Sequence, residues 1–401
     1  MALILARSPY HIAKGEGTDA SLVIDIGTID ESGVYTALRT EPYNLSFRNQ
    51  SHLDVSPFIR DYLIDNDVLV VNITTNKTID VLGTPTATTS TETYIATDGY
   101  AYYEDGSNKD FTSLLRDTTA YYAGSNNVIY RNRKEPIKIP LLCADEVDPL
   151  LHSSATTITF YRGNEELSYT PVKTTDFGYY HDSGGATDTI ASKTTDDSQA
   201  RITYIEEDII DSFEERVLND EGIYESNCAR LFDDAYEENT PSRAVITPLG
   251  DTSKSYELTI IPVQECNYTP HKLIFINRFG VEEELWFFKK SVDNMTTSRE
   301  SFRANTLPNY LDNDLSKHSY ASYNVNGKKT MNMNTGFIPE SFKENIRQLM
   351  LSEKVWIYLD GNKLPITIKN SDMVLKKAVN EKLINYEIEI EFAYDIINTI
   401  G

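Results

Sequence analysis

The clearest pattern in the chain is a strict alternation of apolar and polar residues near its C-terminus. Apolar side chains fill every second position from Ile384 to Phe392, and asparagine or glutamate fills the positions between them. A period of two is typical of a strand that buries one face. Runs rich in β-branched and aromatic residues predict further strands at 21–26, 35–39, 67–74, 137–142, 155–162 and 200–206.

Two segments have helical spacing instead. Ser56 is a favourable cap and Pro57 fits a first helical turn. The apolar residues that follow, as far as Leu63, recur at helical intervals and predict a short helix over 57–64. An amphipathic helix is predicted over 339–352, where one face carries Phe342, Ile346, Leu349 and Met350.

Two hairpins complete the pattern of the last third. Apolar runs at 272–276 and 284–288 flank a turn that contains a glycine. Strands at 354–359 and 364–369 flank an Asp-Gly turn. Large apolar residues in these elements are the predicted core of the last domain, and they are Trp286, Phe287, Phe288, Trp356, Tyr386 and Phe392.

The order of these elements predicts a mainly β fold with minor α. We expect Ig-like β-sandwich domains followed by an α+β C-terminal domain. The first domain is expected over 1–132, with a Thr- and Tyr-rich insertion, and a basic turn at 131–136 marks its end. The second is a β-rich domain over 133–262 with a long polar loop at 163–200, and the C-terminal assembly domain follows over 263–401.

Composition and charge narrow the range of functions. The 401 residues include 37 Lys and Arg against 61 Asp and Glu, a net charge of −24. Such a balance argues against nucleic acid and against anionic lipid as partners, because both require a basic face. No apolar run approaches the roughly 20 residues of a membrane span, so no membrane insertion is expected. The N-terminus has no basic region or cleavage site typical of a signal peptide, which predicts assembly in a cytoplasm.

The search for catalytic or ligand-binding motifs predicts no enzyme, no cofactor and no metal. The chain has no GxSxG, HExxH or P-loop motif. The glycine pattern at 15–20 leads into a strand, whereas a dinucleotide site needs a helix there. Asp312-Asn313-Asp314 begins like a calcium loop but lacks its glycine and its final glutamate. A glycosidase carboxylate pair stays open, because it is defined by a spatial separation that the sequence does not contain.

Tyrosine is unusually abundant, with 26 residues, and many lie between 94 and 130. One interpretation is a β surface held by aromatic cross-strand pairs. The alternative is a contact surface for a neighbouring subunit or a glycan, because tyrosine combines apolar area with a polar tip. The residues of this candidate interface are Tyr100, Tyr102, Tyr103, Tyr121 and Tyr122.

Several strings of the last third resemble a known group of proteins. They include Glu265 to Lys272, Asn277-Arg278-Phe279-Gly280, Trp286 to Lys290, Leu351 to Trp356 and Leu383 to Asp395. Together they are similar to virion structural proteins of tailed phages that infect Bacteroidota. Ser8-Pro9-Tyr10 and the segment 54–63 resemble the N-terminal part of the same group. The likeness is good over 260–401, patchy over 1–70 and missing over about 75–255.

The resemblance implies a tail, baseplate or neck component of a virion and carries no catalytic residues. Its expected partners are further copies of itself, in a homo-oligomeric ring, and other virion tail proteins. Two alternatives remain. One is a receptor- or carbohydrate-binding adhesin of the tail tip, with a host surface glycan as partner, and the other is an enzyme such as a depolymerase.

Overall fold

The structure is a computed structural model of the chain. It describes residues 2–13, 19–29, 35–44, 52–64, 68–81, 84–107, 120–132, 138–143, 156–162, 165–167, 173–175, 188–190, 201–206, 242–247, 255–263, 265, 267–303, 318, 320–370 and 383–397.

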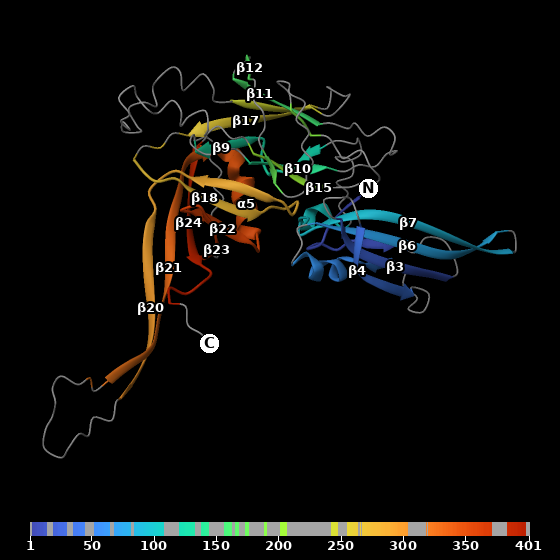
Figure 1. Cartoon of the computed structure of the whole chain (residues 1–401), viewed down its shortest axis with the longest axis horizontal. Coiled ribbons are helices and arrows are strands. Elements are labelled where there is room, and N and C mark those ends of the chain that lie inside the picture. The colour runs from blue at the N-terminus through green and yellow to red at the C-terminus, as the bar shows by residue number, and fades with distance from the viewer. Residues whose placement is uncertain are drawn as a thin grey trace. The chain divides into compact units, whose positions relative to one another are not determined.

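The chain divides into two compact units. The first comprises residues 1–264, 275–285 and 344–352, and the second comprises 265–274, 286–343 and 353–401. Both consist mainly of strands (Figure 1). The described residues form two α-helices, α1 (Ser56–Arg60) and α5 (Lys343–Leu351), with short 3-10 turns beside them. The mainly β fold with minor α is therefore confirmed, and its several sheets are consistent with a β-sandwich organisation.

The first unit opens with a five-stranded sheet in the order β1-β7-β6-β3-β4. Its strands are β1 (Ala2–Leu5), β3 (Asp19–Ile29), β4 (Tyr35–Asn44), β6 (Val68–Val81) and β7 (Thr84–Thr97). All neighbours are antiparallel except β1 and β7, which run parallel. Part of the expected Thr- and Tyr-rich insertion, residues 74–81 and 84–93, lies in β6 and β7, which pair with each other over their whole described length.

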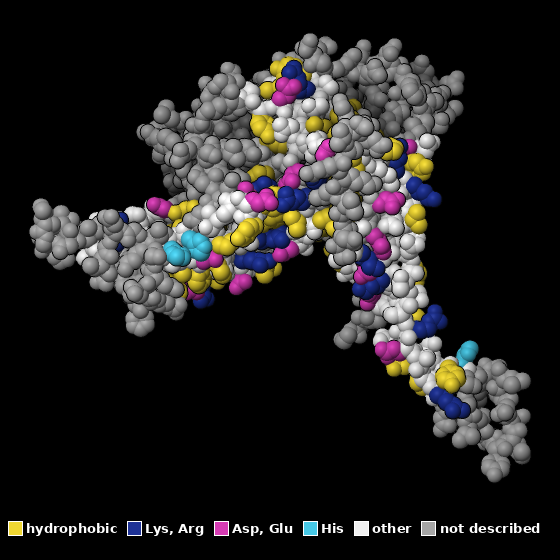
Figure 2. All heavy atoms as spheres, turned by 180° about the vertical axis from the view of Figure 1, so that it is seen from behind, with side chains coloured by type: hydrophobic (Ala, Val, Ile, Leu, Met, Phe, Trp, Pro, Cys, Tyr) yellow, Lys and Arg dark blue, Asp and Glu magenta, His cyan; other side chains and the backbone are white. Residues whose placement is uncertain are grey.

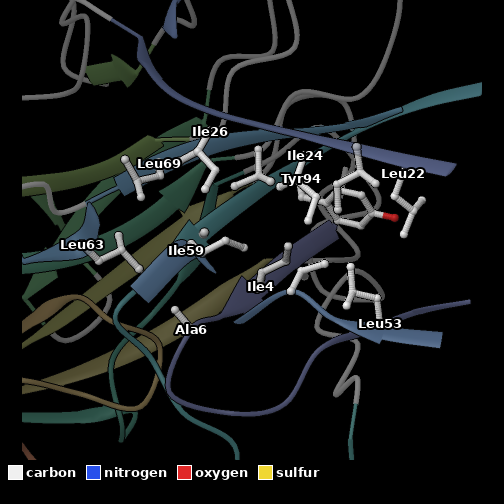
Figure 3. Packing of buried hydrophobic residues seen from close by; sticks show 14 residues of the cluster. Ile4, Ala6, Leu22, Ile24, Ile26, Leu53, Ile59, Leu63, Leu69 and Tyr94 are labelled. Carbon is white, nitrogen blue, oxygen red and sulfur yellow. The ribbon is translucent and has the colours of Figure 1, made fainter. Parts of the chain in front are cut away.

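One face of this sheet carries the hydrophobic core of the first unit (Figure 3). Leu22, Ile24 and Ile26 alternate along β3, so all three point to the same face. Helix α1 and the 3-10 turn after it, η1 (Asp61–Leu63), cover that face with Ile59 and Leu63. The two segments close the core because their apolar positions recur at helical intervals, as the sequence predicts.

The start of α1 differs in detail from the prediction. Ser56 does not cap the helix, since the N-cap position is Val55 and no side chain bonds to it. The neighbouring Asp54 side chain binds backbone groups here instead. Its Oδ1 accepts the N–H of Ser56 at 3.1 Å and the N–H of Tyr10 at 3.0 Å. The Ser56 hydroxyl donates to the carbonyl of Ser8 at 2.6 Å. These bonds join α1 to the strand pair β2 (His11–Ala13) and β5 (His52–Asp54).

Two further sheets of the first unit bear on the predicted border at 132. Strand β8 (Ala120–Tyr122) pairs with β10 (Lys138–Cys143), and β9 (Val128–Asn132) pairs in parallel with β17 (Tyr256–Val263). Strands β8 and β9 thus precede residue 132 in the sequence, but they pair with strands that follow it. The first sheet therefore ends before residue 120. The remaining strands are β11 (Thr156–Arg162), β12 (Glu165–Leu167), β13 (Lys173–Thr175), β14 (Asp188–Ile190), β15 (Arg201–Glu206) and β16 (Arg243–Thr247).

A seven-stranded sheet contains the hairpins predicted for the last third. Its order is β19-β18-β22-β23-β24-β21-β20. The strands are β18 (His271–Ile276), β19 (Glu282–Phe287), β20 (Val292–Arg303), β21 (Tyr320–Pro339), β22 (Val355–Leu359), β23 (Asn362–Ile368) and β24 (Leu383–Phe392). The expected helix over 339–352 is a 3-10 turn, η5 (Glu340–Phe342), followed by α5.

Five of the six residues predicted as C-terminal core are buried: Trp286, Phe287, Phe288, Tyr386 and Phe392. Trp356 was expected to be buried and is only half-buried. Its neighbours Val355 and Ile357 point into the core, so the two-residue period of β22 directs Trp356 to the outer face. There the ammonium of Lys363 lies 4.1 Å from the centre of its ring.

We expect Trp356→Ala to lower the free energy of unfolding by about 1 kcal/mol, well below the ~3–5 kcal/mol of a fully buried tryptophan. The loss is small because the indole is already half-exposed to water in the folded chain, and the cation–π contact that it loses with Lys363 contributes only about 0.5–1 kcal/mol. Urea denaturation of the two proteins measures it. A loss as large as that of a core tryptophan would place the ring inside the protein.

Candidate functional site: an exposed two-stranded arm

The most exposed described region of the second unit is a two-stranded ribbon, here called the arm. It consists of β20 and the first ten residues of β21, that is, residues 292–303 and 320–329. Strand β24 pairs with β21 only from Thr330 onward, so over the arm β21 pairs with β20 alone. Figure 1 shows β20 and β21 running beside each other far along their length.

Exposure along the arm is almost complete. All twelve residues of β20 are exposed. The pairing register changes between Ser298 and Glu300, opposite Asn324, whose φ of 49° lies in the left-handed region. This β-bulge places one extra residue on β21 and increases the local twist of the ribbon.

Large apolar side chains occur on both faces of the arm. Phe302 and Tyr323 share one face, with ring centroids 5.7 Å apart, and Phe302 is 52% exposed. Tyr320 lies opposite Arg303 and therefore projects from the other face, 68% exposed. Met295, nearer the base, is 62% exposed. Figure 2 shows hydrophobic and charged side chains mixed along this ribbon.

The outer edge of the arm is also open. Strand β20 ends the order of the seven-stranded sheet, and no described strand pairs with its outer side. An edge strand of this length presents a row of backbone N–H and C=O groups to other chains. Proteins usually shorten, charge or cover such an edge. The arm therefore has two features of a contact surface, open backbone groups and exposed apolar side chains.

The base of the arm is fixed by the C-terminal residues. Asn326 donates to Asp395 at 3.2 Å and to the carbonyl of Ile397 at 3.1 Å, and it accepts the N–H of Ile397 at 3.0 Å. Lys328 bonds to Glu391 at 2.9 Å, and this bond lowers the pKa of the Glu391 carboxyl. These contacts hold the arm where it leaves the sheet, so its direction is set while its outer part is exposed.

The predicted tyrosine interface differs from the arm and is largely internal. Tyr100 and Tyr122 are buried within the first unit and present no surface to a partner. Tyr102 is half-buried, while Tyr103 is fully exposed. The side chain of Tyr121 lies outside the described residues. The expected interface fails as a set because two of its members stabilise the first unit itself.

Arginine side chains pack against the rings of two of these tyrosines, Tyr100 and Tyr102. The guanidinium of Arg7 lies 4.8 Å from the ring centre of Tyr100, and those of Arg278 and Arg347 lie 4.6 Å and 3.7 Å from that of Tyr102. Arg278 also forms an ion pair with Asp105 at 2.8 Å. Burial raises the pKa of Tyr100 to about 12, so its hydroxyl stays protonated at neutral pH. The cluster joins segments 98–107, 275–285 and 344–352 of the first unit.

Glu283 is a buried residue of segment 275–285 that connects it to segments 120–132 and 344–352, and sequence reasoning missed it. It is 6% exposed. Its carboxylate accepts hydrogen bonds from the backbone N–H of Ser125 at 3.0 Å, from Asn277 at 2.9 Å and from Asn345 at 2.8 Å, and also from the Ser125 hydroxyl. Burial raises the pKa of Glu283, while these donors act in the opposite direction. All four donors are neutral, and the arrangement acts as an internal connection.

The remaining candidates gain no support as sites. Among the described residues, no group of three or more His, Cys, Asp and Glu is arranged to hold a metal ion. Asp312-Asn313-Asp314 lies outside the described residues. His11 and His52 stack edge to face with ring centroids 5.0 Å apart. No helix in the described part of the chain is long and apolar enough to cross a membrane.

Comparisons with known proteins add little to this description. No family model matches the chain, and no curated protein is significantly similar to it. Among solved structures, one match is zebrafish RET cadherin-like domains 1 to 4, with 8% identity and a TM-score of 0.17. The match covers 75% of this chain, which spans about half (52%) of the length of that chain.

Proposed function

We propose that the chain is a structural component of a tailed-phage virion, which forms a tail, baseplate or neck ring by self-association and by contact with neighbouring tail proteins. The observation that carries the proposal is the arm. An edge strand with twelve exposed residues and exposed aromatic side chains is a feature that proteins cover with a partner. The resemblance of residues 260–401 to phage virion proteins supports a phage tail, baseplate or neck as the assembly that contains this contact.

The other features of the described residues agree with a function through contact. The buried carboxylate Glu283 is surrounded by neutral hydrogen-bond donors that hold three segments together. The apolar side chains of Phe302 and Tyr320 on the arm are 52% and 68% exposed. Rings are built from heterologous interfaces that close, and such interfaces cover open strand edges.

Purified particles test the proposal. Mass spectrometry of virions from the phage that encodes the chain should detect the polypeptide in a fixed copy number, and antibody labelling should place it in the tail or neck. Its absence from purified particles would contradict the proposal. Binding of the isolated, unassembled chain to host surface glycan would favour the adhesin instead, and polysaccharide cleavage would favour the depolymerase.

A further inference from the structure

We propose that the arm binds the acidic body of a second copy of this chain, in a head-to-tail contact. The inference rests on the proposed function, which requires that copies of this chain associate with one another. The body is defined as the chain without residues 292–329.

The charge of the arm differs from that of the rest of the chain. The arm, residues 292–303 and 320–329, contains four Lys and Arg against two Asp and Glu, a net charge of +2. The intervening residues 304–319 add one Lys and two Asp, so the body without residues 292–329 carries −25. Copies therefore repel one another through their bodies but not through their arms. Arg299 and Arg303 form no ion pair with any described residue, while both are exposed on β20. An acidic neighbour supplies the partners that these two guanidinium groups lack.

Apolar exposure points to a partner that contacts both faces of the arm. Phe302 and Tyr323 project from one face and Tyr320 from the other. Contact on a single face would leave one of these groups in water. A groove or cleft between elements of a neighbouring copy covers both faces and the open edge of β20 together.

The charges favour an arm-to-body contact over an arm-to-arm contact. Two arms of net charge +2 gain no Coulomb attraction from each other, whereas an arm and a body of −25 do. An arm-to-arm contact is also isologous and stops at a dimer. An arm-to-body contact leaves one free arm and one free body on every pair, so it continues until a ring closes.

An arm-shortened variant provides the first test. Residues 299–325 are replaced by Asn-Gly, which joins the paired residues Ser298 and Asn326 by a two-residue turn and keeps the bonds of Asn326 at the base. Light scattering after size-exclusion chromatography should show oligomers for the full chain and monomers for the variant. Equal thermal midpoints show that the variant is folded. A full chain that stays monomeric at every concentration would overturn the proposal.

Mixing the two proteins decides between the two kinds of contact. A shortened copy still has a body and accepts the arm of a full-length copy, but it offers no arm in return. Native mass spectrometry of mixtures should therefore show shortened copies incorporated once per oligomer, with smaller assemblies as their share rises. Exclusion of the shortened copies, with full-length assemblies unchanged, would identify an arm-to-arm contact and refute the inference.

Point variants test the two chemical contributions. Phe302→Ser with Tyr323→Ser should weaken self-association at least about tenfold, since a buried aromatic residue contributes that much or more. Phe302→Tyr with Tyr323→Phe is the matched control, because it keeps an aromatic ring at both positions of the arm, and should leave association nearly unchanged. Arg299→Glu with Arg303→Glu should also weaken association, by a factor that shrinks as salt rises. Equal effects of the arm and control variants would overturn the proposal.

The outcomes separate this inference from the proposed function. A chain absent from virions that nevertheless associates through the arm leaves the inference standing and removes the proposed function. If the chain is present in virions but its self-association is unchanged by the arm variants, the proposed function stands and the inference is refuted.

Discussion

Replacement of Glu283 by alanine is expected to lower the free energy of unfolding by about 3–5 kcal/mol. The carboxylate accepts bonds from Asn277, from Asn345 and from both the N–H and the hydroxyl of Ser125. Alanine leaves these donors buried without a partner and opens a cavity where the carboxylate was. Each donor left without an acceptor carries a desolvation cost. The segments that contain Ser125, Asn277 and Asn345 also lose the carboxylate that connects them. Urea denaturation measured at neutral pH gives the value.

Glu283→Gln is the control, because it keeps the volume and one acceptor oxygen. Burial raises the pKa of Glu283, so the folded chain holds its proton at pH values where the unfolded chain, with an ordinary carboxyl pKa of about 4.3, has lost it. Stability from this group is therefore present at low pH and decreases as pH rises through the folded pKa. Glutamine does not titrate. The stability of Glu283→Gln relative to the natural chain should increase as pH rises above about 4.3.

Two results would contradict this account of Glu283. An alanine variant as stable as the natural chain would show that the desolvation cost of burying the Glu283 carboxylate is as large as the stabilisation from its four hydrogen bonds. A difference between the glutamine variant and the natural chain that stays constant with pH would show that Glu283 has the same pKa in the folded and unfolded chain.

The sequence predicted elements well where one periodicity dominates. Strand β24 alternates from Ile384 to Phe392, and the apolar residues of this alternation are buried as expected. Segment β22 reads Val-Trp-Ile-Tyr-Leu, which is apolar on both faces, so no pattern indicated that Trp356 points outward. A run without alternation does not reveal which face is buried.

The arm and Glu283 escaped prediction for different reasons. Strand β20 reads Val-Asp-Asn-Met-Thr-Thr-Ser-Arg-Glu-Ser-Phe-Arg, which has no period because neither of its faces is buried within the chain. Glu283 stands between two other glutamates in the sequence and looks like a solvated residue. Only the fold brings Ser125 and Asn345 to it from distant segments. Contacts of such separation leave no local signal.

Replacement of Gly280 by alanine is expected to lower the free energy of unfolding by about 2–5 kcal/mol, from two additive causes. Gly280 has a φ of 79°, a conformation that a Cβ disfavours. A Cβ there would also lie 2.6 Å from the Cβ of Thr97 and 2.8 Å from the backbone nitrogen of Asp98. The clash falls on a fixed contact, since the Thr97 hydroxyl donates to the carbonyl of Phe279 at 2.7 Å.

Gly361→Ala separates the two causes. Gly361, in the turn between β22 and β23, has nearly the same φ, 78°, but a Cβ there would meet nothing within 4 Å. It should therefore show only the backbone cost of about 1–2 kcal/mol. The excess loss in Gly280→Ala measures how tightly the turn of the β18–β19 hairpin lies against the end of β7 within the first unit. Equal losses at the two positions would mean that Thr97 moves aside freely and that this turn does not depend on a residue without a side chain.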